Sequence, residues 1–205
     1  MPYNDDELKF DTVPNRLTAI RIAIVPVVVI LLYMRTYTTD IIAGFTFAAA
    51  AITDYFDGKI ARETKTITIY GKLMDPLADK FLVICSLIML QWLERVHPFF
   101  VMVLICRELA ITSLRALASA EGVIIAASPG GKWKNLTQMF AIPFMMAKPG
   151  LLGIPLFAIG EVLLYLSLGM SLWSGLQYIM GFFAGVTVRA KERRSLRKQH
   201  SKNEQ

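Results

Sequence analysis

Residues 54–79 read DYFDGKIARETKTITIYGKLMDPLAD. Two pairs of aspartates lie at the ends of this stretch. Asp54 and Asp57 are three residues apart, while Asp75 and Asp79 are four residues apart. Both spacings put the members of a pair on one face of a helix, because an α-helix turns once every ~3.6 residues. A short connector of about ten residues, 63–72, separates the pairs, so we expect two helices that fold back on each other and bring four carboxylates to one depth.

Apolar segments surround this stretch and indicate the class of the protein. Hydrophobic residues make up 55% of the 205 residues and charged residues 19%, below the roughly 25% of charged residues in soluble domains. A helix needs about 20 predominantly apolar residues to cross a bilayer. We expect six such helices, at about 17–34, 41–61, 73–93, 98–120, 136–146 and within 151–188. The sequence therefore predicts an all-α integral membrane protein with six transmembrane helices.

Basic residues predict the orientation of these helices. With a cytoplasmic N-terminus, 15 Lys and Arg side chains fall in cytoplasmic segments and 3 on the opposite side. Cytoplasmic loops carry an excess of Lys and Arg, so both termini are expected in the cytoplasm. The last segment alone carries seven Lys and Arg and two Glu, which favours a position beside anionic lipid over a nucleic-acid partner. We expect three regions: a cytoplasmic segment at 1–16, a six-helix membrane domain at 17–188 and a basic cytoplasmic tail at 189–205.

Four aspartates at the ends of membrane helices need a cationic partner. A single charge at membrane depth costs about 2.5–3.5 kcal/mol. Ligands that are all oxygen favour a hard divalent cation, Mg²⁺ or Mn²⁺, and two such ions can hold a diphosphate. A cation transporter with aspartates along its pathway is an alternative. That hypothesis leaves unexplained the other residues at fixed spacing in this stretch: Gly58, Ala61, Arg62 and Gly71.

The complete pattern resembles one known family. It matches the motif of the CDP-alcohol phosphotransferases at each position of Asp54-x2-Asp57-Gly58-x2-Ala61-Arg62-x8-Gly71-x3-Asp75-x3-Asp79. The resemblance covers nearly all of the chain up to the basic tail, and the rest of the chain resembles the bacterial branch that makes phosphatidylglycerol phosphate. It implies the CDP-alcohol phosphotransferase fold, usually as a homodimer, in the bacterial cytoplasmic membrane with a cytoplasm-facing site.

The resemblance also implies a reaction and roles for the four aspartates. The phosphatidyl group of CDP-diacylglycerol is transferred to an alcohol and CMP is displaced, with two divalent metal ions (Mg²⁺ or Mn²⁺) as cofactors. Asp54, Asp57 and Asp75 are expected as the principal metal ligands. Asp79 is expected as the general base, and it can also contact metal.

A further set of residues is expected at the nucleotide and phosphates of the donor lipid. Arg62 adds a bidentate phosphate donor, and Gly58 lets a ligand approach the backbone. Asn15, Thr18 and Arg21 recur on one helix face that points into the bundle. An alternative makes Asn15 a helix N-cap and Arg21 an ion-pair partner of an aspartate. The expected set is Asn15, Thr18, Arg21, Asp54, Gly58, Ala61, Arg62 and Gly71.

Surplus positive charge indicates that the acceptor is also an anion. Four basic residues exceed what a metal-bound diphosphate needs: Arg107, Arg115, Lys132 and Lys134. Because Arg and Lys bind phosphate well, we expect sn-glycerol 3-phosphate as the acceptor, with Glu108 orienting an arginine. Inositol phosphate or serine is an alternative acceptor. Alternatively, Lys132 and Lys134 serve only the membrane orientation.

Overall fold

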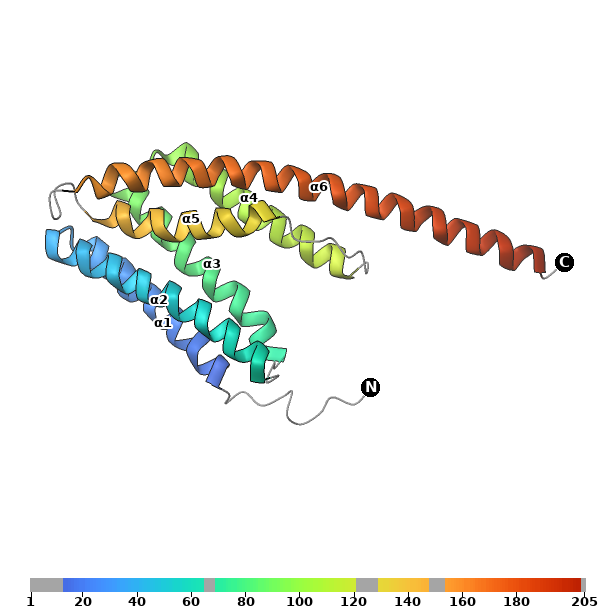
Figure 1. The fold of residues 1–205 in the computed structure, drawn as a ribbon, viewed down its shortest axis with the longest axis horizontal. Coiled ribbons are helices and arrows are strands. Elements are labelled where there is room, and N and C mark those ends of the chain that lie inside the picture. The colour runs from blue at the N-terminus through green and yellow to red at the C-terminus, as the bar shows by residue number, and fades with distance from the viewer. Residues whose placement is uncertain (1–12, 65–68, 121–128, 148–153, 204–205) are drawn as a thin grey trace. The chain divides into compact units, whose positions relative to one another are not determined.

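The computed structural model describes residues 13–64, 69–120, 129–147 and 154–203. Within these ranges the chain forms α-helices and no strands (Figure 1). The helices are α1 (Val13–Tyr33), α2 (Tyr37–Thr64), α3 (Ile69–Trp92), α4 (Pro98–Ala120), α5 (Pro129–Met146) and α6 (Leu156–Asn203). The predicted all-α class and the order of six helices are confirmed for the described residues.

Prolines mark where three of these helices begin. Pro98 and Pro129 are the first residues of α4 and α5, and Pro155 directly precedes α6. Proline suits the first turn of a helix, because its missing N–H would have no partner within the helix there. As a result α5 begins at Pro129, although the sequence predicted its start at about Leu136.

Two other boundaries differ from the prediction. α2 extends to Thr64 and α3 begins at Ile69, so the predicted ten-residue connector is helical at both ends. α6 continues to Asn203, across the predicted start of the basic tail at Arg189. The residues after Arg189 include no proline or glycine that would stop the helix.

The chain divides into two compact units, which are described separately. Unit 1 comprises residues 1–101 and 136–165, and unit 2 comprises residues 102–135 and 166–205. α1, α2 and α3 belong to unit 1, whereas α4, α5 and α6 contribute residues to both units.

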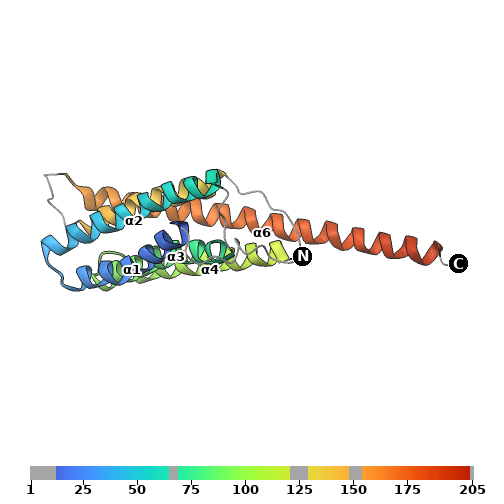
Figure 2. The same cartoon turned by 90° about the horizontal axis from the view of Figure 1, so that it is seen from below.

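In unit 1, α1 packs along both α2 and α3, and the latter two touch each other over a much shorter stretch (Figure 2). Buried apolar side chains fill the space between these helices, among them Leu32, Phe47 and Leu82. α5 and α6 approach closely at Gly160, where an added Cβ would lie 2.9 Å from the carbonyl oxygen of Ala141. Glycine is therefore required at this contact.

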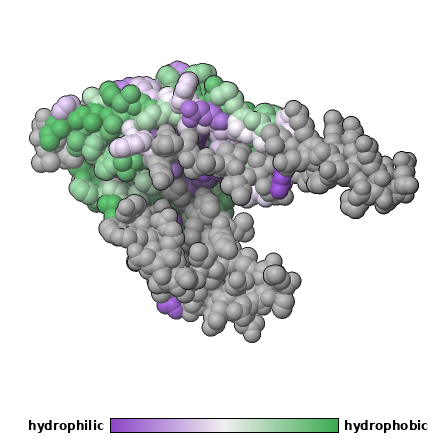
Figure 3. Space-filling view, turned by 45° about the vertical axis from the view of Figure 1, so that its right-hand side comes forward, coloured by the Kyte–Doolittle hydropathy of each residue, from purple (hydrophilic) through white to green (hydrophobic). Residues whose placement is uncertain are grey.

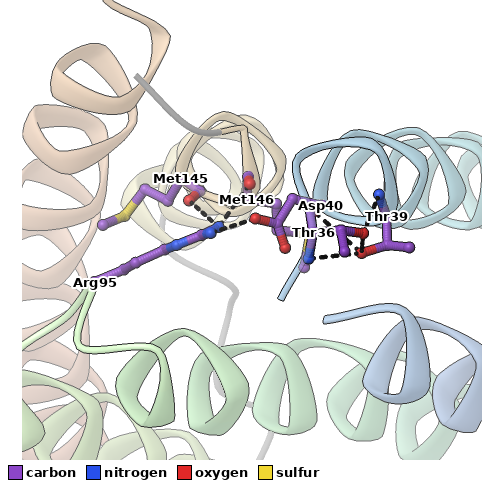
Figure 4. Close-up of polar contacts among 6 residues, drawn as sticks. All are labelled: Thr36, Thr39, Asp40, Arg95, Met145 and Met146. Carbon is purple, nitrogen blue, oxygen red and sulfur yellow. Dashed lines mark hydrogen bonds and ion pairs between the residues drawn. The ribbon is translucent and has the colours of Figure 1, made fainter. Parts of the chain in front are cut away.

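Unit 1 contains a cluster of polar contacts among Asp40, Arg95, Met145 and Met146, here called the Arg95 cluster (Figure 4). Arg95 donates from Nη2 to Asp40 Oδ2 at 2.5 Å. It donates from Nη1 to the carbonyl oxygens of Met145 at 3.2 Å and Met146 at 2.6 Å. The last carbonyl groups of a helix have no hydrogen-bond donor within the helix. Arg95 supplies a donor to the last two carbonyl groups of α5.

The start of α2 positions Asp40, and the end of α3 positions Arg95. Thr36 and Thr39 form a reciprocal cap at the start of α2: the backbone N–H of Thr39 donates to Thr36 Oγ1 at 3.4 Å, and that of Thr36 donates to Thr39 Oγ1 at 3.3 Å (Figure 4). Asp40 follows directly. At the end of α3, Glu94 adopts a left-handed conformation with φ of 60°. The backbone N–H of Arg95 donates to Leu90, which completes a Schellman turn.

Many large apolar side chains are exposed on the helices, while some polar side chains are buried with the apolar core. Exposed large side chains include Phe45, Trp173 and Phe183, and the space-filling view shows broad hydrophobic areas over the described residues (Figure 3). Buried polar side chains include Arg21, Lys134 and Ser171. Among the described residues, only Leu156–Thr187 has both the length and the apolar composition to cross a membrane; the apolar parts Thr18–Tyr33 and Lys80–Trp92 are shorter.

Candidate functional site

The acidic motif lies where α2 ends and α3 begins, both in unit 1. Asp54 and Asp57 belong to the last three turns of α2, and Asp75 and Asp79 belong to the first three turns of α3. Because only four residues separate the two helices, the two acidic pairs lie near adjoining helix ends. The side chains of the four aspartates are outside the described part of the structure, so their predicted convergence stays a prediction.

The remaining motif residues occupy the same helix ends. Gly58, Ala61 and Arg62 lie in α2 and Gly71 lies in α3. Their backbones are helical, and their side chains are also outside the described part. Gly71 is the third residue of α3, which begins at Ile69.

α1 supplies buried polar side chains, as the sequence predicted. Thr18 is 3% exposed and Arg21 is 4% exposed, and they are one turn apart on the same face. Asn15 is the third residue of α1, inside its first turn. The alternative that Asn15 caps this helix is therefore wrong.

In unit 2, charged side chains of α4 and α5 meet in a second polar cluster. Arg107 donates from Nη1 to Glu108 Oε2 at 3.2 Å, and Lys134 forms an ion pair with the same carboxylate oxygen. Arg107 also donates from Nε to the carbonyl oxygen of Ser171 at 2.9 Å and from Nη2 to Ser174 Oγ at 3.1 Å, both in α6. We call these five residues the Arg107 cluster.

The Arg107 cluster carries more positive than negative charge. Two cations, Arg107 and Lys134, share the carboxylate of Glu108, which gives a formal charge of +1. Arginine has five N–H donors, and the three contacts use one on each nitrogen. Within the described residues, one N–H on Nη1 and one on Nη2 of Arg107 make no further hydrogen bond, so both can donate to a ligand. The predicted orienting role of Glu108 agrees with this geometry, and the cluster can accept an anion.

The other two residues predicted to bind the acceptor are Arg115 and Lys132. Neither is among the contacts of the Arg107 cluster given above. Arg115 is exposed, and its guanidinium lies 5.4 Å from the ring centre of Tyr178. It follows Arg107 by eight residues, about 12 Å along the helix axis. Lys132 is in the first turn of α5, and its side chain is outside the described part.

Sequence reasoning missed the contribution of α6. Ser167, Ser171 and Ser174 are buried and recur at intervals of four and three residues inside an apolar segment. This spacing places them on one face of the helix, and polar residues at helical spacing in an apolar segment were the available signal.

An apolar groove of about 540 Å³ lies between α2 and α5 in unit 1. Its α2 wall runs from Ile41 to Ile52 and its α5 wall from Leu136 to Phe144, with Ala147 and Leu156 at one end. The twelve residues from Ile41 to Ile52 span about 16 Å along the helix axis, roughly half of the ~30 Å hydrocarbon core of a bilayer. Ile52 precedes Asp54 of the acidic motif by two residues.

Comparison with known proteins identifies the same family as the acidic motif. The CDP-alcohol phosphatidyltransferase family matches residues 11–173, which is most of the chain. The chain belongs to this family. Residues 11–173 include every predicted site residue from Asn15 to Lys134, but they end one residue before Ser174.

Three similar proteins share the same enzyme name. The chain is 33% identical over 169 residues to the CDP-diacylglycerol--glycerol-3-phosphate 3-phosphatidyltransferase of Rickettsia bellii, covering 82% of this chain and 93% of the relative. The Haemophilus influenzae protein of that name is 33% identical, covering 84% and 93%. An Arabidopsis thaliana protein, number 2 of that name, is 36% identical, covering 83% and 79%.

The chemistry of the acidic motif fits divalent metal ions. Asp54, Asp57, Asp75 and Asp79 offer only carboxylate oxygens, the ligands that Mg²⁺ and Mn²⁺ prefer, from two adjoining helix ends. Among the side chains that the structure describes, no group of three or more His, Cys, Asp or Glu could hold a metal ion. The motif aspartates are not among those side chains.

Proposed function

We propose that this protein transfers the phosphatidyl group of CDP-diacylglycerol to sn-glycerol 3-phosphate, releasing CMP and forming phosphatidylglycerol phosphate. The observation that carries the proposal is the complete family motif at the adjoining ends of α2 and α3. The names of the relatives, which share about a third of their residues with this chain, support the choice of donor and acceptor.

Asp54, Asp57, Asp75 and Asp79 would hold two divalent metal ions, which when bound supply positive charge beside the donor diphosphate. Asp79 takes the proton of the attacking hydroxyl of glycerol 3-phosphate. The hydroxyl oxygen then forms a bond to the lipid-linked phosphorus. The bond from that phosphorus to the CMP oxygen breaks, and CMP leaves with the electron pair.

The polar residues beside the motif bind the nucleotide and its phosphates. Arg62 is suited to donate two hydrogen bonds to a phosphate, and Gly58 and Ala61 leave room for the ligand. Asn15, Thr18 and Arg21 add donors from α1, of which Thr18 and Arg21 are buried among the helices of unit 1. Gly71 completes the set that we assign to the donor.

The phosphate of the acceptor binds at basic residues of α4 and α5: Arg107, Arg115, Lys132 and Lys134. Support comes from the Arg107 cluster, whose surplus charge of +1 and remaining N–H groups suit a phosphate.

A bilayer is the proposed environment of all six helices. α1 to α5 are 18 to 28 residues long, close to the about 20 that a span requires. The many exposed large apolar side chains suit lipid rather than water. The groove between α2 and α5 is suited in length to an acyl chain of the donor. We further propose a homodimer in the bacterial cytoplasmic membrane with both termini in the cytoplasm.

The proposal is tested with purified protein in detergent, CDP-diacylglycerol and labelled glycerol 3-phosphate, with and without Mg²⁺ or Mn²⁺. We expect CMP release and a labelled lipid only with metal. An Asp79→Asn variant should keep its fold and lose about 10²–10⁴-fold in turnover. CMP release with serine or inositol phosphate, but not with glycerol 3-phosphate, would assign another acceptor.

A further inference from the structure

The side chain of Ser174 holds one of the proposed acceptor-binding residues from another helix. Ser174 Oγ accepts a hydrogen bond from Arg107 Nη2 at 3.1 Å, and the serine is 5% exposed. The neighbouring Nε of Arg107 donates to the carbonyl oxygen of Ser171 at 2.9 Å. One edge of the planar guanidinium thus faces α6 through two hydrogen bonds.

We propose that Ser174 is a positioning residue for the acceptor phosphate. It fixes the guanidinium of Arg107 in the orientation that presents the remaining N–H groups to the phosphate. This inference rests on the proposed function, in which Arg107 binds glycerol 3-phosphate. Ser174 itself does not contact the substrate.

The chemistry of arginine makes such positioning effective. Its side chain has many rotamers, so a free guanidinium loses entropy when a ligand immobilises it. Phosphate recognition depends on the plane of the guanidinium, because two parallel N–H groups must meet two oxygens. Ser174 and the Ser171 carbonyl define this plane from α6, and Glu108 defines it from α4.

Gly175 provides the space that this arrangement needs. A Cβ at this position would lie 3.4 Å from Arg107 Nε and 3.7 Å from Ile111 Cδ1. A methyl group would fit in contact with Arg107, but a branched side chain would push it away from α6. Gly169 lies on the same helix, and a Cβ there would meet no atom within 4 Å. The two glycines therefore make a matched pair.

The test is a double-mutant cycle in the transferase assay. We expect Ser174→Ala to raise the KM for glycerol 3-phosphate about 3- to 10-fold, with kcat and the KM for CDP-diacylglycerol changed less than about twofold. Ser174→Thr keeps the hydroxyl and should stay close to wild type. In the Arg107→Ala background, Ser174→Ala should cause no further rise in KM. A merely structural serine would add the same factor in both backgrounds, and that result would overturn the inference.

The glycine pair gives an independent measurement. Gly175→Val should raise the acceptor KM, whereas Gly169→Val should not, although both substitutions put valine into the same helix. Equal KM values for the two valine variants would overturn the inference.

The outcomes separate this inference from the proposed function. Wild-type protein without turnover on glycerol 3-phosphate overturns the proposed function and this inference together. A raised KM in Arg107→Ala but an unchanged KM in Ser174→Ala overturns this inference alone.

Discussion

Arg95 and Arg107 have the same side-chain exposure of 11%, and each donates hydrogen bonds to three groups, but the charges around them differ. Arg95 pairs with Asp40, which is 0% exposed, and its other partners are carbonyls at the end of α5. Arg107 shares Glu108, which is 24% exposed, with Lys134. The Arg95 cluster is therefore neutral, whereas the Arg107 cluster has a charge of +1.

This comparison separates a structural arginine from a ligand-binding one. A buried charge is costly unless it is paired, so the neutral Arg95 cluster is complete without a ligand. The Arg107 cluster has surplus positive charge beside a partly exposed carboxylate, which favours the binding of an anion. Burial and the number of hydrogen bonds do not distinguish the two arginines, but charge balance does.

Arg95→Ala should have the largest effect on stability. It removes the ion pair of a fully buried carboxylate, and breaking such a pair costs about 3–5 kcal/mol. Thermal unfolding in detergent should show a lower midpoint. Asp40→Leu combined with Arg95→Met should recover part of the loss, because both charges are gone. If Arg95→Ala unfolds at the same temperature as the wild type, Arg95 does not stabilise the fold.

Arg107→Ala should affect binding more than stability. We expect the KM for glycerol 3-phosphate to rise about 10- to 100-fold, because hydrogen bonds to a charged group are lost. The KM for CDP-diacylglycerol should change little, and the unfolding midpoint should fall less than in Arg95→Ala. An unchanged acceptor KM would move the phosphate site elsewhere.

Glu108→Gln should sharpen the contrast between the two clusters. Glutamine keeps an oxygen for Arg107 but raises the formal charge of the cluster from +1 to +2. The KM for glycerol 3-phosphate should fall about 2- to 5-fold at low salt. Stability should decrease by about 1–3 kcal/mol, because buried Lys134 loses its charged partner.

The matched change in the other cluster is Asp40→Asn. It should lower the unfolding midpoint and leave the acceptor KM unchanged, because that cluster has no proposed ligand. If both neutralised variants bind the acceptor with the same KM, charge balance does not distinguish the clusters.

Arg35→Met should have the smallest effect. Arg35 lies 3.9 Å above the ring of Trp92 and donates from Nη2 to the Trp92 carbonyl at 3.3 Å, at an exposed site. Exposed cation–π contacts contribute about 0.5–1 kcal/mol. We expect a shift in the unfolding midpoint well below that of Arg95→Ala, with unchanged kinetics. A shift as large as that of Arg95→Ala would mean that exposure does not weaken such contacts here.

Much of the site could be predicted because its signals are local. The spacing of the aspartates, of Thr18 and Arg21, and of the small residues in the motif depends only on helical periodicity. The apolar segments predicted the number and order of the helices, although α5 begins earlier and α6 ends later than predicted. The burial of Thr18 and Arg21 agrees with the same periodicity. The contact of Glu108 with its neighbour Arg107 does not depend on periodicity, because adjacent residues do not share a helix face.

Contacts between distant parts of the chain were not predictable in this way. Asp40 and Arg95 are 55 residues apart, and Arg107 and Ser174 are 67 residues apart. Helical periodicity says which face a residue occupies, but not which neighbouring helix that face meets. The sequence therefore indicates no partner for Arg95 or Ser174.

The order of the helices, the family and the residues of the acidic motif can be inferred without a structure, because periodicity, apolar length and motif spacing are properties of a single continuous chain. The different surroundings of Arg95 and Arg107 arise from packing. Their partners come from helices far away in sequence, and only packing brings one arginine to a single buried carboxylate and the other to a carboxylate shared with a second cation.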